Sequence, residues 1–330
     1  MNNLTVKTLQ SATIGPSVPC GHFLVKVHSV FRKAINLQLL GYSGIKARTK
    51  YKEIGRAHSS TTKELEPTNN INLITILSCE SLDYPQGIRL DSVENFADYN
   101  LTQNGCGNFG GYGIILKQPN TTAYIYISFS GANKLKYESL PHILCPETYW
   151  QICVNLLAAM QDKAMVELHI RTLTTNYVAF GTMSELLTNA ALNLGESLRN
   201  GNANALRNAV SRLVGLGPGL TPSGDDFLCG FLAAAHCQPI VRVGRLPELN
   251  QAIMAGLKKT NSISATFLHC AINGEVCCAL YDFAKAISSG VDLNDKLNRL
   301  CTIGHSSGMD IATGFLYGLK IWKQQQQHSQ

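Results

Sequence analysis

The sequence has little charge, and the charge it has is not clustered. Asp, Glu, Lys and Arg make up 15% of the 330 residues, and the net charge of +6 is spread along the chain without a basic run. Because nucleic-acid binding needs a basic patch or stripe, no nucleic-acid partner is expected. The charge content is also low for the surface of a free monomer, which favours burial in a homo-oligomer or against other subunits.

Segments typical of membrane or secreted proteins are missing as well. No charged stretch followed by an apolar stretch opens the sequence, and the longest apolar run, residues 227–237, is too short to span a bilayer. The eleven cysteines show no CxxC pair and no matching histidine spacing. We therefore expect reduced thiols, a cytoplasmic location and no membrane partner.

Familiar phosphate-binding and nucleophile motifs are not found. Gly219 and Gly224 have the spacing of a P-loop, but Asp225 and Asp226 stand where that loop needs Lys and Ser or Thr. The glycines of residues 215–219 lack the dinucleotide-binding spacing, and no serine nucleophile elbow occurs. These absences exclude the common nucleotide-binding loops and the α/β-hydrolase type of active site.

The most informative segment present is residues 215–226, Gly-Leu-Gly-Pro-Gly-Leu-Thr-Pro-Ser-Gly-Asp-Asp. Glycine bends and proline stiffens such a loop, and the apolar helical pattern that follows places backbone N–H groups at a helix start, where a polar ligand can bind. Two ligand types suit backbone donors combined with carboxylate acceptors. One is a phosphate with Mg²⁺ held by Asp225 and Asp226. The other is a ureido or carbamoyl group, whose NH₂ donates to a carboxylate.

A weaker copy of this segment follows 84 residues later. Residues 223–232 align without a gap on residues 307–316, and Ser, Gly, the second acid, a later Gly and the Phe-Leu pair all match. The repeat predicts two helix N-termini built alike and facing one site. Gly230 and Gly314, inside these helices, predict close packing between them.

Capping offers a structural alternative for part of this segment. Ser223 with Asp226, and Ser307 with Asp310, fit the capping box, in which serine and acid satisfy each other's backbone N–H. A cap needs one acid, so Asp225 is the strongest functional candidate.

The candidate site combines these segments with two later ones. Asp225 is predicted to bind the ligand directly or to hold a metal with Asp226, and His305 to transfer a proton. The residues predicted to bind the ligand are Gly217, Gly219, Thr221, Ser223, Gly224, Asp226, Thr260, Ser264, Ser306, Ser307, Gly308 and Asp310.

The pattern of short and long periodic segments predicts an α+β protein, with a β-rich N-terminal domain (residues 1–147) and a mostly helical C-terminal domain (residues 148–330). The glycine-dense stretch 104–111 is predicted to be a wide hairpin loop, with a ligand-facing loop as the alternative. The predicted strands are residues 23–30, 71–78, 112–116, 123–129 and 165–170. The predicted helices are residues 149–161, 186–198, 203–213, the segment from 227, 246–257, 264–271, 275–287 and 307–322.

The segment 215–226 resembles the AllH family, which includes a subunit associated with oxamate carbamoyltransferase. Residues 260–264, 304–310 and 28–31 are similar to other motifs of that family. The resemblance implies transfer of a carbamoyl group between a ureido acid such as oxalurate and phosphate, giving carbamoyl phosphate, in allantoin degradation. It also implies partner subunits.

Two other functions stay open at this point. The chain could be a non-catalytic subunit for assembly or ligand binding, or a metal-dependent enzyme that acts on a phosphorylated metabolite. In every case the expected ligand is a small polar metabolite.

Overall fold

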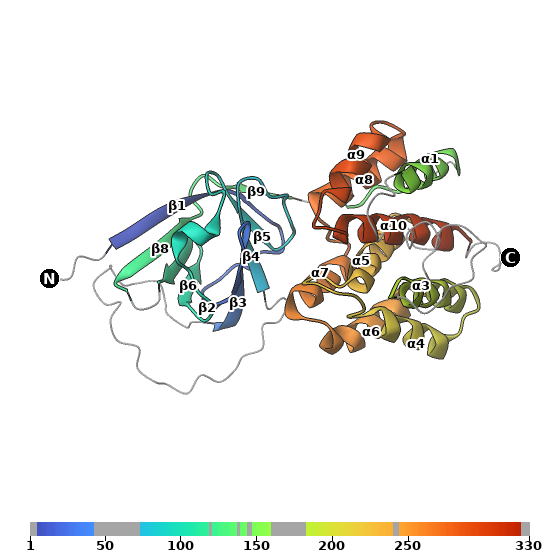
Figure 1. The fold of residues 1–330 in the computed structure, drawn as a ribbon, viewed down its shortest axis with the longest axis horizontal. Helices are drawn as coiled ribbons and strands as arrows, with labels where there is room; N and C mark the ends of the chain where they lie inside the picture. The colour runs from blue at the N-terminus through green and yellow to red at the C-terminus, as the bar shows by residue number, and fades with distance from the viewer. Residues whose placement is uncertain are drawn as a thin grey trace. The chain divides into compact units, whose positions relative to one another are not determined.

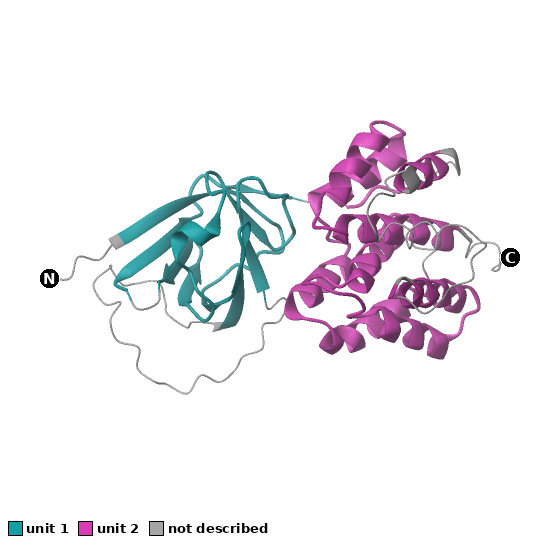
Figure 2. Cartoon of the chain, viewed as in Figure 1, with its two compact units in different colours: residues 1–136 teal, residues 137–330 magenta. Residues whose placement is uncertain are grey.

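The computed structural model describes residues 5–42, 73–118, 121–136, 139–143, 147–159, 183–239 and 244–324. The chain divides into two compact units, residues 1–136 and 137–330 (Figure 2). Strands form the first unit and helices the second (Figure 1), which confirms the α+β class with the β-rich part first. Independent domains with a boundary at residue 147 stay a prediction.

Within the described part of the first unit, nine strands form one sheet in the order β5-β4-β3-β2-β6-β7-β8-β1-β9. Strand β1 also pairs with β5, so the sheet closes on itself. The strands are β1 (Thr5–Ile14), β2 (Phe23–Val30), β3 (Ala34–Tyr42), β4 (Leu73–Leu77), β5 (Gly87–Leu90), β6 (Cys106–Gly110), β7 (Gly113–Lys117), β8 (Ala123–Ser128) and β9 (Asn133–Lys134), with a short 3₁₀ helix η1 (Phe96–Tyr99).

Alternation of side chains along the strands builds the core of this unit. Val27 of β2 pairs with Leu37 of β3, which pairs with Ile74 of β4, and all three are fully buried. The neighbouring pair, Asn36 with Thr75, lies on the other face of the sheet because successive side chains point to opposite faces. Two of these inward residues, Val27 and Ile74, are β-branched, which favours the strand conformation in these segments.

The predicted strands at 23–30, 71–78, 112–116 and 123–129 are confirmed, and β2 has the predicted bounds. The prediction of a wide hairpin loop at 104–111 is wrong, because Cys106–Gly110 is strand β6 between β2 and β7. A Cβ atom on Gly107 would lie 2.1 Å from the carbonyl oxygen of Ile115. Here glycine permits close approach of the next strand rather than forming a loop.

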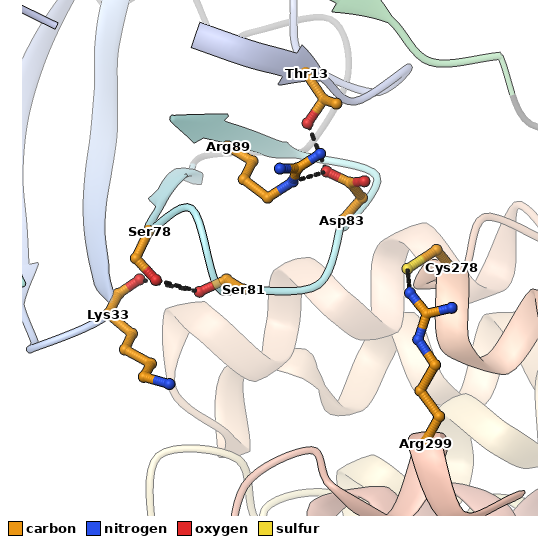
Figure 3. Close-up of polar contacts among 8 residues, drawn as sticks. All are labelled: Thr13, Lys33, Ser78, Ser81, Asp83, Arg89, Cys278 and Arg299. Atoms are coloured by element: carbon orange, nitrogen blue, oxygen red, sulfur yellow. Dashed lines mark hydrogen bonds and ion pairs between the residues drawn. The ribbon is translucent and has the colours of Figure 1, made fainter. Parts of the chain in front are cut away.

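A polar cluster links the end of β1 to the segment before β5 (Figure 3). The Thr13 hydroxyl donates to Asp83 Oδ1 at 2.5 Å, and Arg89 Nε donates to the same oxygen at 3.0 Å. Because Thr13 and Arg89 are paired residues of β1 and β5, the carboxylate reinforces the pairing that closes the sheet.

Helices form the second unit. They are α1 (Glu147–Ala159), α3 (Met183–Arg199), α4 (Ala203–Leu213), α5 (Ser223–His236), α6 (Leu246–Gly256), η3 (Leu257–Lys259), α7 (Ser262–Ile272), α8 (Cys278–Ser289), α9 (Leu293–Cys301) and α10 (Ser307–Gln324). Every predicted helix is confirmed, whereas α9 was not predicted. The predicted strand at 165–170 and the glutamine-rich end after residue 324 lie outside the described residues. Among the described residues, no helix is long and apolar enough to cross a membrane.

Helix α5 forms the centre of this unit and packs along α10 (Figure 1). A Cβ on Gly230 would lie 2.0 Å from the carbonyl oxygen of Ile311, and one on Gly314 would lie 1.9 Å from that of Phe227. The predicted close packing of the two helices is confirmed. The two contacts are equivalent under the 84-residue repeat, so the helices cross symmetrically at these glycines.

Candidate functional site

Two helix–loop–helix segments of the second unit, α4–α5 and α9–α10, are built alike. Gly224 N–H donates to the carbonyl of Leu216 at 2.8 Å, and Gly308 N–H donates to that of Ile303 at 3.0 Å. A Cβ on Gly224 or Gly308 would lie 2.0 Å from a carbonyl oxygen at the end of the preceding helix. Each serine–glycine pair therefore starts its helix tightly against the helix before it, and the structure brings the two helix starts together.

The first loop is longer than the second. The two acceptors of these hydrogen bonds, Leu216 and Ile303, lie before the loops and are 87 residues apart (303 − 216). The two donors, Gly224 and Gly308, lie after the loops and are 84 residues apart (308 − 224). The first loop therefore holds three additional residues. Its tip, residues 218–220, is exposed, and the Leu220 carbonyl accepts a hydrogen bond from Asn261 Nδ2 at 2.8 Å.

The predicted capping boxes are wrong, because the hydroxyl partners are exchanged between the helices. The N-cap residue of α5 is Pro222, which has no side-chain capping bond. Asp226 interacts with the hydroxyls of Ser307 and Thr221, and Asp310 with those of Ser223 and Ser306. The glycine-mediated crossing brings the first turns of α5 and α10 together, so each acid meets a serine of the opposite helix.

The hydroxyls of Thr221 and Ser307 also contact each other, with their oxygens 2.8 Å apart. Both residues are half-buried, whereas the two acids beneath them are buried. The arrangement is a layered polar cluster in which four hydroxyls surround two carboxyl groups.

Burial raises the pKa values of both acids. Asp226 and Asp310 are 4% and 2% exposed. Desolvation raises the pKa of Asp226 to about 7, against the opposing effect of the Ser307 and Thr221 hydroxyls. Desolvation and the charge of Asp226 raise the pKa of Asp310 well above its usual value. The pair can therefore hold one carboxylic acid beside one carboxylate, which is a suitable arrangement for acid–base chemistry.

The carboxyl group of Asp226 is incompletely satisfied. Asp226 Oδ2 is buried and has no hydrogen-bond partner among the described residues. A buried acceptor of this kind is costly unless a donor reaches it. An NH₂ group of a ligand, or a proton held by the acid, would supply that donor.

Asp225 lies in a different environment from Asp226. Its Oδ1 accepts from Gly215 N–H at 2.8 Å, and its Oδ2 accepts from the Thr260 hydroxyl. Ser264 lies close enough to lower the Asp225 pKa, although its hydroxyl makes no well-aligned hydrogen bond within the described residues. Burial outweighs these contacts and raises the pKa of Asp225. Asp225 thus joins the start of the loop to the start of α7.

The remaining predicted residues lie around this cluster. Gly217 has φ +119° and approaches Ser223 so closely that a Cβ would lie 2.8 Å from its nitrogen. Gly219 lies at the exposed tip, and His305 is exposed in the turn before α10. Gly224 and Gly308 direct their N–H groups to carbonyls of the chain itself. Ligand binding by these residues stays a prediction.

Asn261 is a site residue that sequence reasoning did not select. Its Oδ1 accepts from the backbone N–H groups of Ile263 and Ser264, so it caps α7, while its Nδ2 holds the loop tip at Leu220. The signal was present, since Asn before a helical segment is a common N-cap. Its contact with a loop some 40 residues earlier had no signal in the sequence.

The predicted metal site finds no support in these contacts. Among the described residues, no group of three or more His, Cys, Asp or Glu side chains could hold a metal ion. Both oxygens of Asp225 face protein donors, which leaves Asp226 as the only predicted metal ligand with an available oxygen. The residues present therefore do not fit Mg²⁺ at this position.

Comparison with known protein families gives a match over the part of the chain that contains the polar cluster. Residues 213–319 match the family model described as oxamate carbamoyltransferase subunit AllH. The match confirms the resemblance over the two helix starts and the segment between them, and the family description names one subunit of a larger enzyme. Residues 28–31 lie outside the matched part. No solved structure matches the chain.

Proposed function

We propose that the chain is a subunit of a carbamoyltransferase-type enzyme that transfers a carbamoyl group between a ureido acid such as oxalurate and phosphate. The observation that carries the proposal is the buried pair of Asp226 and Asp310 at the crossing of α5 and α10, within the residues that match the AllH family. The description of that family supports partner subunits, and a cytoplasmic location remains part of the proposal.

The substrate would use the polar cluster in two ways. The ionised form of Asp226 accepts a hydrogen bond from the carbamoyl NH₂ through its unsatisfied Oδ2. The hydroxyls of Thr221 and Ser307, half-buried above the acids, donate to the carbamoyl or phosphate oxygens. We assign Asp225 the role of holding the loop in place through Gly215 and Thr260, instead of the direct ligand contact predicted from the sequence.

The transfer step needs a proton donor and acceptor. A phosphate oxygen attacks the carbamoyl carbon, and the bond from that carbon to the oxamate nitrogen breaks. Protonated Asp310 gives its proton to the departing nitrogen, and the proton of the attacking phosphate returns to the acid pair. His305, in the adjacent turn, remains the candidate that exchanges protons with solvent.

Isothermal titration with carbamoyl phosphate, phosphate and oxalurate tests the proposal. The wild-type chain, alone or with its partner subunits, is expected to bind at least one of them. Asp226→Asn should weaken that binding at least tenfold, about 1.4 kcal/mol, because an amide replaces the carboxylate acceptor. Asp295→Asn, a carboxylate change in the first turn of α9, is the matched control. Absence of binding by the wild type in both settings would overturn the proposal.

A second candidate function is a non-catalytic subunit for assembly or ligand binding. The contacts of Asp225 favour it, because holding the loop in its shape is enough to explain the presence of this acid. Activity of the reconstituted complex discriminates the two. Catalysis by this chain predicts at least a tenfold loss of kcat in Asp310→Asn, whereas a non-catalytic role leaves kcat near that of the wild type.

A further inference from the structure

Strand β2 carries a bulge that brings together two polar side chains adjacent in sequence. Val27 pairs with Leu37 and Ser29 pairs with Asn36, so His28 and Ser29 together lie opposite one residue of β3. Successive side chains of a regular strand point to opposite faces, and a bulge re-aims them. His28 Nδ1 and Ser29 Oγ accordingly lie 3.1 Å apart.

A chain of hydrogen bonds across three strands orients this pair. The Thr75 hydroxyl of β4 donates to Asn36 Oδ1 at 2.8 Å, which fixes the amide so that Asn36 Nδ2 donates to Ser29 Oγ at 3.0 Å. Asn36 and Thr75 are buried, whereas Ser29 and His28 are half-buried. Because Asn36 occupies one lone pair of Ser29, the hydroxyl proton can be directed to His28 Nδ1.

We propose that Ser29 is a nucleophile activated by His28, and that this second site accepts the acyl group of an activated ester. The distance between the two side chains is within the range of nucleophile–base pairs, and the Asn36 amide holds the Ser29 hydroxyl in place. The carbamoyl transfer proposed above uses none of these residues.

The covalent step balances within the pair and its substrate. Ser29 Oγ forms a bond to the carbonyl carbon as its proton moves to His28 Nδ1. The bond from that carbon to the leaving oxygen breaks, and the leaving oxygen takes the proton from His28. Water then attacks the acyl-serine with His28 as the base, which releases the acid and restores Ser29.

A fluorophosphonate probe tests the proposal on the full-length chain. It is attacked by activated serines, with loss of fluoride, and leaves a stable adduct that mass spectrometry of peptides can locate. We expect one adduct per chain, on Ser29, with none in Ser29→Ala. Labelling of His28→Gln should be at least tenfold slower, because a general base contributes about a hundredfold or more.

Two further variants separate activation from folding. Thr75→Val keeps the side-chain shape but releases Asn36, so labelling should slow while far-UV circular dichroism stays the same. Ser92→Ala changes an exposed serine and should label like the wild type. No adduct on folded wild-type protein, an adduct on another residue, or unchanged labelling of His28→Gln would each overturn the proposal.

Discussion

Three aspartates lie in the first turns of α5 and α10, and their surroundings give them different chemistry. Asp225 is bonded through both oxygens to the loop start and to Thr260. Asp226 retains a buried oxygen without a partner among the described residues, and its charge raises the pKa of Asp310. Desolvation is the main cause of the raised pKa in all three, so the three acids differ mainly in the hydrogen-bond donors around them.

Asp226 predicts a specific dependence of stability on pH. Its pKa is about 7 in the folded protein against an ordinary value of 3.8, so the folded state binds this proton more tightly than the unfolded chain. The resulting stability is complete below pH 3.8 and is lost as the pH rises through about 7. The unfolding free energy of Asp226→Asn should therefore decline less over this pH range than that of the wild type. The difference between the two declines should be on the order of 4 kcal/mol at most.

Urea unfolding followed at a series of pH values measures this effect. The unfolding free energy of the wild type relative to Asp226→Asn should fall from acidic to neutral pH. Asp295→Asn, on α9, controls for a change of net charge. Parallel curves for the wild type and Asp226→Asn would show that Asp226 keeps an ordinary pKa in the folded protein.

The sequence predicted which segments carry the candidate site better than it predicted the role of each residue. The motif 215–226 and its repeat identified both helix starts, because glycine and serine spacing is a local property. The exchange of serine partners depends on how α5 crosses α10, and local pattern could not distinguish it from two capping boxes. The same limit applies to Asp225, whose partner Thr260 is 35 residues away.

The close packing of α5 against α10 positions the residues of the candidate site. Gly230 and Gly314 let the backbone of one helix contact the other, and a Cβ at either position would overlap a carbonyl oxygen. The acids lie about one turn and the serines about two turns before these glycines. The spacing between the helices therefore sets the distances in the polar cluster.

Gly314→Ala should destabilise the second unit. The new Cβ would lie 1.9 Å from the carbonyl oxygen of Phe227, so the helices must separate. Overpacking of this kind costs about 1–3 kcal/mol or more, which exceeds the gain in helix propensity of about 1 kcal/mol. Thermal unfolding measures the change. Gly244→Ala, where an added Cβ meets nothing within 4 Å, is the control, and equal melting temperatures for the two variants would contradict the close crossing.

Glycine also explains which elements the sequence predicted incorrectly. β2 was predicted with its observed bounds because β-branched residues alternate along it. β6 was taken for a loop because glycine is common in turns, whereas Gly107 is required by the neighbouring β7. Glycine occurs both in loops and where two strands approach closely, so the glycine-rich sequence alone could not distinguish the two.

At the scale of the whole molecule, the division into a β unit and a helical unit predicts two unfolding events. The first unit has a core of its own within the closed sheet, and α5 and α10 form the centre of the second. Each unit buries its own apolar side chains, as independently folding domains do. The unfolding transition of one unit is therefore expected to differ from that of the other.

The two tryptophans offer a way to observe one unit alone. Trp150 and Trp322 are the only tryptophans of the chain and both belong to residues 137–330, where they are buried. Tryptophan fluorescence therefore follows the helical unit, whereas calorimetry follows both units. We expect the fluorescence transition to match one of two calorimetric transitions, and Gly314→Ala to lower the temperature of that transition while leaving the other in place. A single calorimetric transition that coincides with fluorescence, and that Gly314→Ala shifts as a whole, would mean that the two units unfold as one domain.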